Sequence, residues 1–186
     1  MVATYLNWET QNNFDDEQGG YEHRLLNYIF QQWSLTGYLT KGDTMQDEGT
    51  DEDPIYIIFK PGYPSGNRPF QITAVRTTIE PQETYSTGHA WQDGARVRIN
   101  IRCRRQDRPN SEDDDEGNDG TMPAEFHLME SEVERIARQM QANGITGFMR
   151  LVFLGNARVE NQTNFASSLW ESNTLIGMEY VKQNHA

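Results

Sequence analysis

The sequence predicts an α+β fold: a mostly antiparallel sheet of about five strands, packed with two helices and carrying long acidic loops. Within residues 95–105, nine residues alternate strictly between apolar and polar side chains and are rich in β-branched types, which is typical of a strand with one buried face. The apolar positions are Val97, Ile99, Ile101 and Cys103. The predicted elements run helix, three strands, helix, two strands, and this order lacks the regular alternation of a parallel doubly wound sheet.

Two segments repeat apolar residues at helical spacing, residues 20–34 and residues 128–142. In the second, Ser131 and Glu134 have the spacing of a capping box, and Asn143-Gly144 favours a helix end. The apolar positions are Tyr21, Leu25, Tyr28, Ile29 and Trp33 in the first segment and Met129, Val133, Ile136, Ala137 and Met140 in the second.

Four further runs predict strands, because they are short and rich in apolar or β-branched residues. They are Ile55–Phe59, Phe70–Ile79, Phe148–Leu154 and Leu175–Val181. The segments between the elements predict loops, of which two are strongly acidic. The loops are residues 40–54 (acidic), 81–94, 107–123 (acidic and predicted to be disordered) and 155–172.

The predicted organisation is an N-terminal arm over residues 1–19, a single α+β domain over residues 20–182 and a short tail over residues 183–186. The arm has no hydrophobic period but carries aromatic residues. One interpretation is a loose terminus; the other is an arm that orders on a neighbouring subunit. Its candidate anchors are Tyr5, Trp8 and Phe14.

The polar face of the alternating strand carries four arginines, although the chain as a whole has a net charge of −12. They are Arg96, Arg98, Arg102 and Arg104. We take them as a candidate subunit interface that meets acidic surface on another copy or partner. Two alternatives remain open: contact with nucleic-acid phosphates, and a solvated face paired with local acids such as Glu80 and Glu83. The acidity of the chain disfavours a general nucleic-acid binder.

Signals of catalysis, cofactors and metals are weak, so we expect neither an enzyme nor a cofactor. His127 and Glu130 are three residues apart, and such a lone pair is a poor metal signature. The loop around Asp115 resembles part of a calcium-binding loop, but it lacks the required acids at two positions. The single Cys103 excludes an internal disulfide, and its place on the apolar face predicts a core residue. No long apolar run or leader pattern is present, so we expect no membrane contact.

The order and character of these elements resemble the tail-terminator (tail-completion) proteins of long-tailed viruses of bacteria and archaea, the minor tail protein U type. The resemblance covers roughly residues 20–182. Longer acidic insertions and a longer arm depart from the pattern, which leaves open a related neck protein. The segments that carry the resemblance are the helix Tyr21–Trp33, the strand Ile55–Lys60, the proline-marked strand Pro69–Arg76, the loop Trp91-Gln92-Asp93-Gly94 feeding Val97–Arg105, the helix Glu132–Met140, the strand Phe148–Leu154 and the closing strand Gly177–Val181 after Trp170.

The resemblance implies a structural virion protein assembled in the host cytoplasm. Typically about six copies would form a homo-oligomeric ring in the neck, which caps the tail tube, ends its growth and joins tail to head. Its partners would be other copies, the tail tube protein and a head-closure or connector protein, and DNA would pass through the channel without specific binding. The alternatives are another head–tail connector or tube-end protein and, in a different class, a small nucleic-acid-binding module that adds Trp91 and Tyr85 to the arginines.

Basic residues are almost all arginine: only Lys41, Lys60 and Lys182 are lysines, and the sequence pI is about 4.7. Acidic surfaces that avoid lysine suit concentrated salt, where self-repulsion is screened. We therefore hypothesise a halophilic source and expect the protein to unfold on dilution from molar to low salt, followed by circular dichroism. Equal stability in both would contradict this and leave ordinary compositional drift as the explanation.

Overall fold

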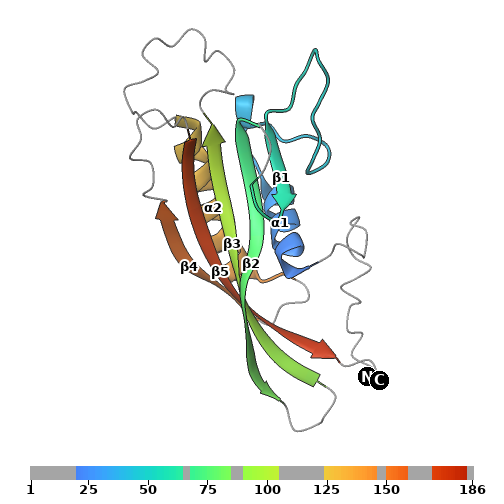
Figure 1. Ribbon diagram of the computed structural model, residues 1–186, viewed down its shortest axis with the longest axis vertical. Coiled ribbons are helices and arrows are strands. Elements are labelled where there is room, and N and C mark those ends of the chain that lie inside the picture. Colours follow the sequence, from blue (N-terminus) through green and yellow to red (C-terminus); the bar gives the residue numbers. More distant parts are fainter. Residues whose placement is uncertain are drawn as a thin grey trace.

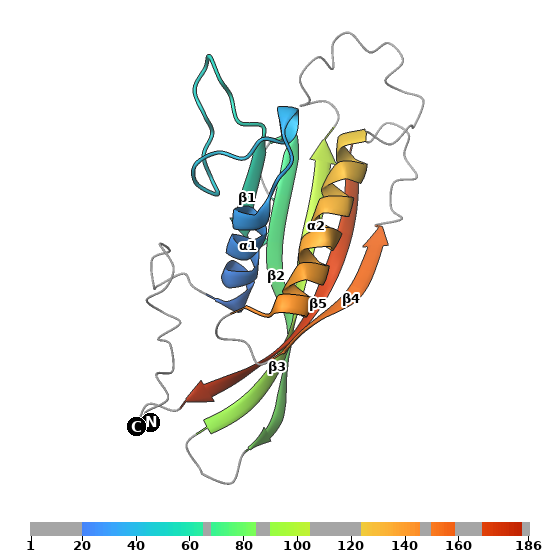
Figure 2. The ribbon, with the colours of Figure 1, turned by 180° about the vertical axis from the view of Figure 1, so that it is seen from behind.

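The computed structural model describes residues 20–64, 68–84, 90–104, 124–145, 150–158 and 169–183. These residues form two layers, a five-stranded sheet and two α-helices that both lie on one face of it (Figures 1 and 2). The predicted α+β class and the mostly antiparallel sheet are confirmed. The elements are α1 (Tyr21–Gln32), the short 3-10 helix η2 (Gly37–Leu39), β1 (Ile57–Pro61), β2 (Phe70–Thr84), β3 (Ala90–Arg104), α2 (Ala124–Asn143), β4 (Arg150–Arg158) and β5 (Leu169–Gln183).

The strands lie in the order β1-β2-β3-β5-β4, which places β3 at the centre of the sheet. β1 runs parallel to β2, and every other neighbouring pair is antiparallel. The alternating segment of the sequence is therefore the central strand. Among the described helices, none is long and apolar enough to cross a membrane.

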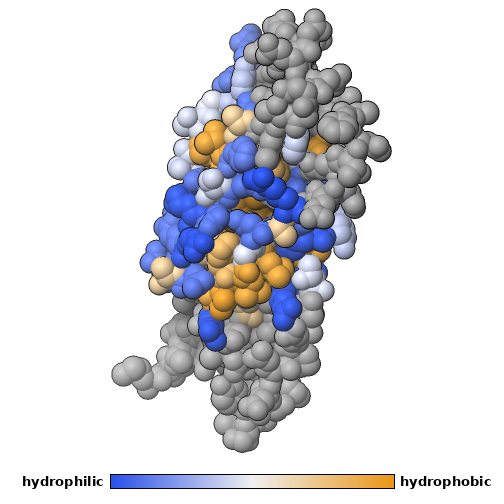
Figure 3. All heavy atoms as spheres, turned by 90° about the vertical axis from the view of Figure 1, so that its left-hand side faces the viewer, coloured by the Kyte–Doolittle hydropathy of each residue, from blue (hydrophilic) through white to orange (hydrophobic). Residues whose placement is uncertain are grey.

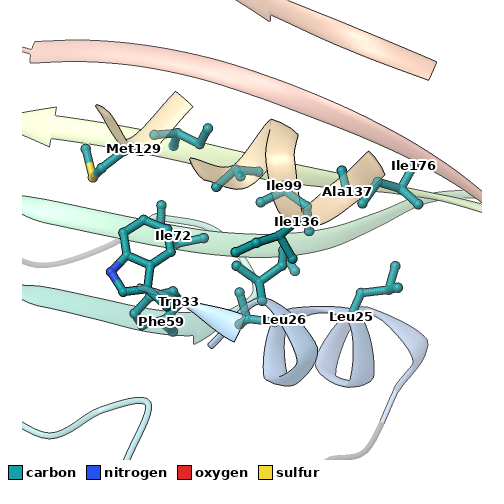
Figure 4. Packing of buried hydrophobic residues seen from close by; sticks show 14 of the residues in the cluster. Leu25, Leu26, Trp33, Phe59, Ile72, Ile99, Met129, Ile136, Ala137 and Ile176 are labelled. Atoms are coloured by element: carbon teal, nitrogen blue, oxygen red, sulfur yellow. The ribbon is translucent and has the colours of Figure 1, made fainter. Parts of the chain in front are cut away.

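The core lies between the helices and one face of the sheet (Figure 4). The predicted apolar face of β3 is completely buried there, Cys103 included. Neighbouring strands present their own apolar residues beside it, and the Trp33 and Phe30 rings of the α1 region meet Phe59 of β1 edge to face. Burying each large aliphatic or aromatic side chain contributes about 1.5–3 kcal/mol, so this layer supplies most of the driving force. The core positions of β2 and β5 include Phe70, Ile72, Ala74, Ile176 and Met178.

Helix α2 begins four residues earlier than predicted, at Ala124. Ser131 therefore lies inside the helix and does not cap it. The extra turn is held by Phe126, which is fully buried one turn before Met129 and extends the apolar stripe towards the N-terminus. The predicted helix end is confirmed, because Gly144 has a positive φ of 71° directly after Asn143.

Four strands are longer than predicted. The predicted loop over residues 81–94 contains the ends of β2 and β3, and the predicted loop over residues 155–172 contains the end of β4 and the start of β5. These stretches are too polar to read as strands. They are nevertheless paired, because a backbone ladder satisfies its N–H and C=O groups whatever the side chains are. Gly155, with φ 124°, lies at a register shift where β4 bends along β5.

A buried carboxylate, Glu132 on α2, ties the two helices together. Its Oε1 accepts hydrogen bonds from the Ser34 backbone N (2.9 Å) and Oγ (2.8 Å), just beyond α1. Arg135 holds both carboxylate oxygens at 2.8 Å and also donates to the Gln32 carbonyl oxygen. The Arg135 hydrogen bonds, aided by those of Ser34 and opposed by burial, lower the pKa of Glu132 below its ordinary value.

We expect Glu132→Ala to lower the free energy of unfolding by about 2 kcal/mol at neutral pH, because four hydrogen bonds to a charged group are lost. The pKa of Glu132 is lower in the folded state than in the unfolded state, where it is about 4.3. The carboxylate therefore contributes its full stabilisation at pH values above about 4.3. This stabilisation is lost as the pH falls through the folded-state pKa. The difference between wild type and Glu132→Gln in urea unfolding should therefore shrink between pH 7 and about pH 3.

Glu134→Ala on the same helix is the matched control. Its side chain lies nearer the surface and pairs with Arg138 at 2.7 Å, the predicted i,i+4 pair, so its loss should cost less than about 1 kcal/mol. If the difference in free energy of unfolding between wild type and Glu132→Gln stays constant with pH, the stabilising role of the Glu132 carboxylate is contradicted.

Candidate subunit interface on the open face of the sheet

The strand register places the four predicted arginines on the sheet face opposite the helices, the face towards the viewer in Figure 1. We call these residues, Arg96, Arg98, Arg102 and Arg104, the arginine face. Arg96 is exposed and the other three are half-buried. They share this face because they alternate with the buried residues of β3. The sheet thus brings together all four residues of the predicted interface.

Neighbouring strands add residues to the same face that sequence analysis did not include. Lys60 of β1 lies beside Thr73 of β2, which in turn lies beside Asn100 of β3. Glu171 of β5 pairs in register with Arg102. Among the described side chains of β1, β3 and β5, the charged groups of this face are five cations and one carboxylate, a positive cluster on an acidic chain: Lys60, Arg96, Arg98, Arg102 and Arg104, with Glu171.

Asn100 lies at the centre of the arginine face and is almost completely buried. Its Nδ2 donates to Glu171 Oε1 at 2.8 Å and to Asn173 Oδ1 at 3.0 Å, both on β5. Its Oδ1, by contrast, is buried and has no hydrogen-bond partner, and the same is true of Thr73 Oγ1. Buried polar atoms normally find partners, so these two are exceptions within the described chain.

Two of the four arginines also contain a buried polar atom without a partner. The Nε atoms of Arg98 and Arg102 are buried and form no hydrogen bond. Burial lowers the pKa of Arg102, with a further contribution from the charge of Arg104, and Glu171 opposes the shift. Arginine remains protonated in proteins, so Arg102 is a partly desolvated cation. The Arg98 guanidinium lies 6.0 Å from the centre of the exposed Tyr63 ring.

A second charged surface lies at the β1 edge of the sheet, where the segment between η2 and β1 projects (Figures 1 and 2). It contains an ordered turn that presents the exposed Asp51, Glu52 and Asp53, which we call the acidic turn. Gly49 bridges to Pro54, the Thr50 N–H donates to the Asp53 carbonyl oxygen, and the Asp53 N–H donates to Thr50 Oγ1, each of the two bonds at 3.0 Å.

The turn is anchored from both sides. Asp47 accepts hydrogen bonds from the N–H groups of Asp43 and Gly49 at 2.9 Å, which lowers the pKa of its carboxyl. Glu48 pairs with Arg68 at 2.8 Å. Met45 is buried in the core, and its carbonyl oxygen accepts a hydrogen bond from the Phe59 N–H. This part of the predicted acidic loop therefore has a defined shape.

A third surface of different character lies on the side of β4, where Figure 3 shows apolar residues framed by hydrophilic ones. Leu154 of β4 is 49% exposed. Nearby polar groups are already occupied: Arg158 binds Glu130 at 2.8 Å, and Asn156 donates to Glu134 at 2.9 Å. This side thus offers apolar contact rather than charge.

For most of the remaining candidates the structure describes no side chain. The arm anchors Tyr5, Trp8 and Phe14, the acids near Asp115, and Tyr85 lie outside the described residues, as do the side chains of Glu80, Glu83 and Trp91. His127 and Glu130 are 3.9 Å apart, but Glu130 is bound by Arg158. Within the described ranges, no three His, Cys, Asp or Glu side chains group closely enough to hold a metal ion.

Sequence signals for the missed residues differ in strength. Glu171 lies on β5 among residues that face the helices, namely Trp170, Ser172 and Thr174. This alternation between the two faces begins in the segment predicted as a loop, so it was a signal that could have identified a strand there. No local pattern places Lys60 on the arginine face. Its position there depends on the parallel pairing of β1 with β2, which the sequence pattern of β1 alone does not reveal.

The described chain thus carries two charged surfaces of opposite sign, one on the open face of the sheet and one beyond its β1 edge. Their chemistry suits contact with other macromolecules, because both consist of charged side chains on ordered backbone. A scan against protein-family models finds no match for this chain, and no curated protein matches it either.

Proposed function

We propose that the protein is a structural subunit of a virion ring of the tail-terminator type, which caps the tail tube, ends its growth and joins tail to head. The observation that carries the proposal is the pair of oppositely charged surfaces at different places on one domain. A ring is built from head-to-tail contacts, and each such contact joins two different patches of the subunit. The arginine face and the acidic turn are two such patches.

The length of the strands adds support. β1 pairs with β2 only as far as Ala74, and β4 pairs with β5 only from Ser172 to Glu179. Beyond these points β2, β3 and β5 continue as a three-stranded ribbon past the ends of both helices (Figures 1 and 2). A ribbon that extends from a domain gives a subunit reach towards its neighbours, and its edges carry backbone groups available for pairing.

The apolar side at β4 adds a further contact surface for an assembly. Another head–tail connector or tube-end protein would use the same features, so ring formation and tube binding must be tested separately. In a nucleic-acid module the arginines would instead contact phosphates, and binding would fall steeply with salt.

The test begins with the wild-type protein in sedimentation and in tube assembly. We expect a ring several times the 21.5 kDa subunit mass, bound at one end of tubes whose growth it stops. Arg98→Glu with Arg102→Glu should leave the fold intact and weaken ring formation at least about tenfold, since losing one close charge pair costs about 1.5 kcal/mol or more.

Arg76→Glu is the control, because Arg76 is exposed on β2 in register with Val97 and so lies on the other side of the sheet from the arginine face. It should assemble as wild type. A wild-type protein that stays monomeric, or rings that never bind tubes, would refute the proposal. Salt-sensitive binding of a single-stranded oligonucleotide by a monomer, lost in the double variant, would favour the nucleic-acid alternative.

A further inference from the structure

We infer that the partner of the arginine face is the acidic turn of a second copy of this chain. The inference rests on the proposed ring and names the two surfaces that form its repeated contact. It assigns the positive role to β3 and the negative role to the turn around Asp51, Glu52 and Asp53.

Charge complementarity selects this occupant. A chain of net charge −12 repels its own copies in most orientations, so attraction requires a locally positive surface. The arginine face with Lys60 is such a surface. Residues 43–53 hold six acids and no basic residue, and Asp51, Glu52 and Asp53 form no ion pair within the described chain.

The side chains of the two surfaces also match in hydrogen-bonding character. Arg98 and Arg102 are only half-buried, and a guanidinium donates hydrogen bonds whereas a carboxylate only accepts them. On the turn, the backbone N–H groups of Asp51 and Glu52 make no hydrogen bond within the described chain, so the turn offers donors as well.

Both surfaces are ordered before they meet. The turn is closed by the Gly49–Pro54 bridge and the Thr50–Asp53 hydrogen bonds, and Arg98 and Arg102 extend from the central strand of the sheet. Preorganised groups lose little conformational entropy on binding, so more of the interaction energy appears as affinity. Because one surface is a sheet face and the other a turn at the sheet edge, the contact joins unlike patches and propagates head to tail.

A charge-exchange experiment tests the pairing. The face variant is Arg98→Glu with Arg102→Glu, and the turn variant is Asp51→Lys with Glu52→Lys and Asp53→Lys. The turn variant keeps Gly49 and Thr50, so the backbone hydrogen bonds of the turn remain. Arg76→Glu and Asp43→Lys are the controls, since both residues are exposed and their side chains form no hydrogen bond or ion pair within the described chain. Circular dichroism and thermal unfolding establish that every variant is folded.

Each variant alone should fail to form rings, because it brings together two surfaces of the same sign. An equimolar mixture should recover rings in which the two variants alternate, since each face then meets a turn of opposite charge. A single chain that carries all five substitutions should also recover self-assembly, to within about tenfold of the wild-type association constant. Native mass spectrometry separates the alternating rings from those of one kind of subunit.

The inference is overturned if the folded turn variant forms rings as well as wild type does. It is also overturned if neither the mixture nor the five-substitution chain recovers assembly. In both cases the proposed function would still stand if wild-type rings cap tubes. If wild-type rings form by this contact but do not bind tubes, only the proposed function is refuted. A monomeric wild type overturns both.

Discussion

Burial of one face of β3 beneath α1 and α2 is the interaction on which the other features depend. Side chains of a strand alternate between two faces, so burying Val97, Ile99 and Ile101 turns Arg98 and Arg102 to the opposite side. A slip of one residue in the register would bring the arginines into the core, at a cost that the fold could not sustain. Hydrophobic burial thus specifies where the positive charge of this acidic chain is displayed.

The helices that cover the core are held by polar contacts of their own. Glu132 joins α2 to the segment after α1, and Arg158 and Asn156 join β4 to α2. These contacts pair several charged and polar groups on the helix side of the molecule. On the open face, Asn100 is satisfied only in part and two guanidiniums keep buried donors unused. The open face therefore differs from the helix side in the cluster of cations that it presents.

Local periodicity predicted the elements that alternate or repeat cleanly: β3 with its two faces, and both helices. It failed where pairing, not hydrophobicity, maintains a strand, as in the polar ends of β2 and β3. It also missed contacts between distant segments, such as the Ser34–Glu132 hydrogen bonds and the placement of Lys60 on the arginine face. The acidic segment before β1 is polar apart from the buried Met45, and its order also comes from hydrogen bonds of Asp47 and Thr50 that composition alone does not reveal.

The pairing of β3 with β5 has a consequence for the timing of folding. Residues 90–104 must find residues 169–183, with α2 and β4 lying between them in the chain. Contacts of such large sequence separation form slowly, because loop closure must be achieved before the ladder stabilises. Until β5 docks, Asn100 lacks both of its acceptors and Arg102 lacks its carboxylate neighbour. The arginine face is thus completed only after β5 has docked on β3.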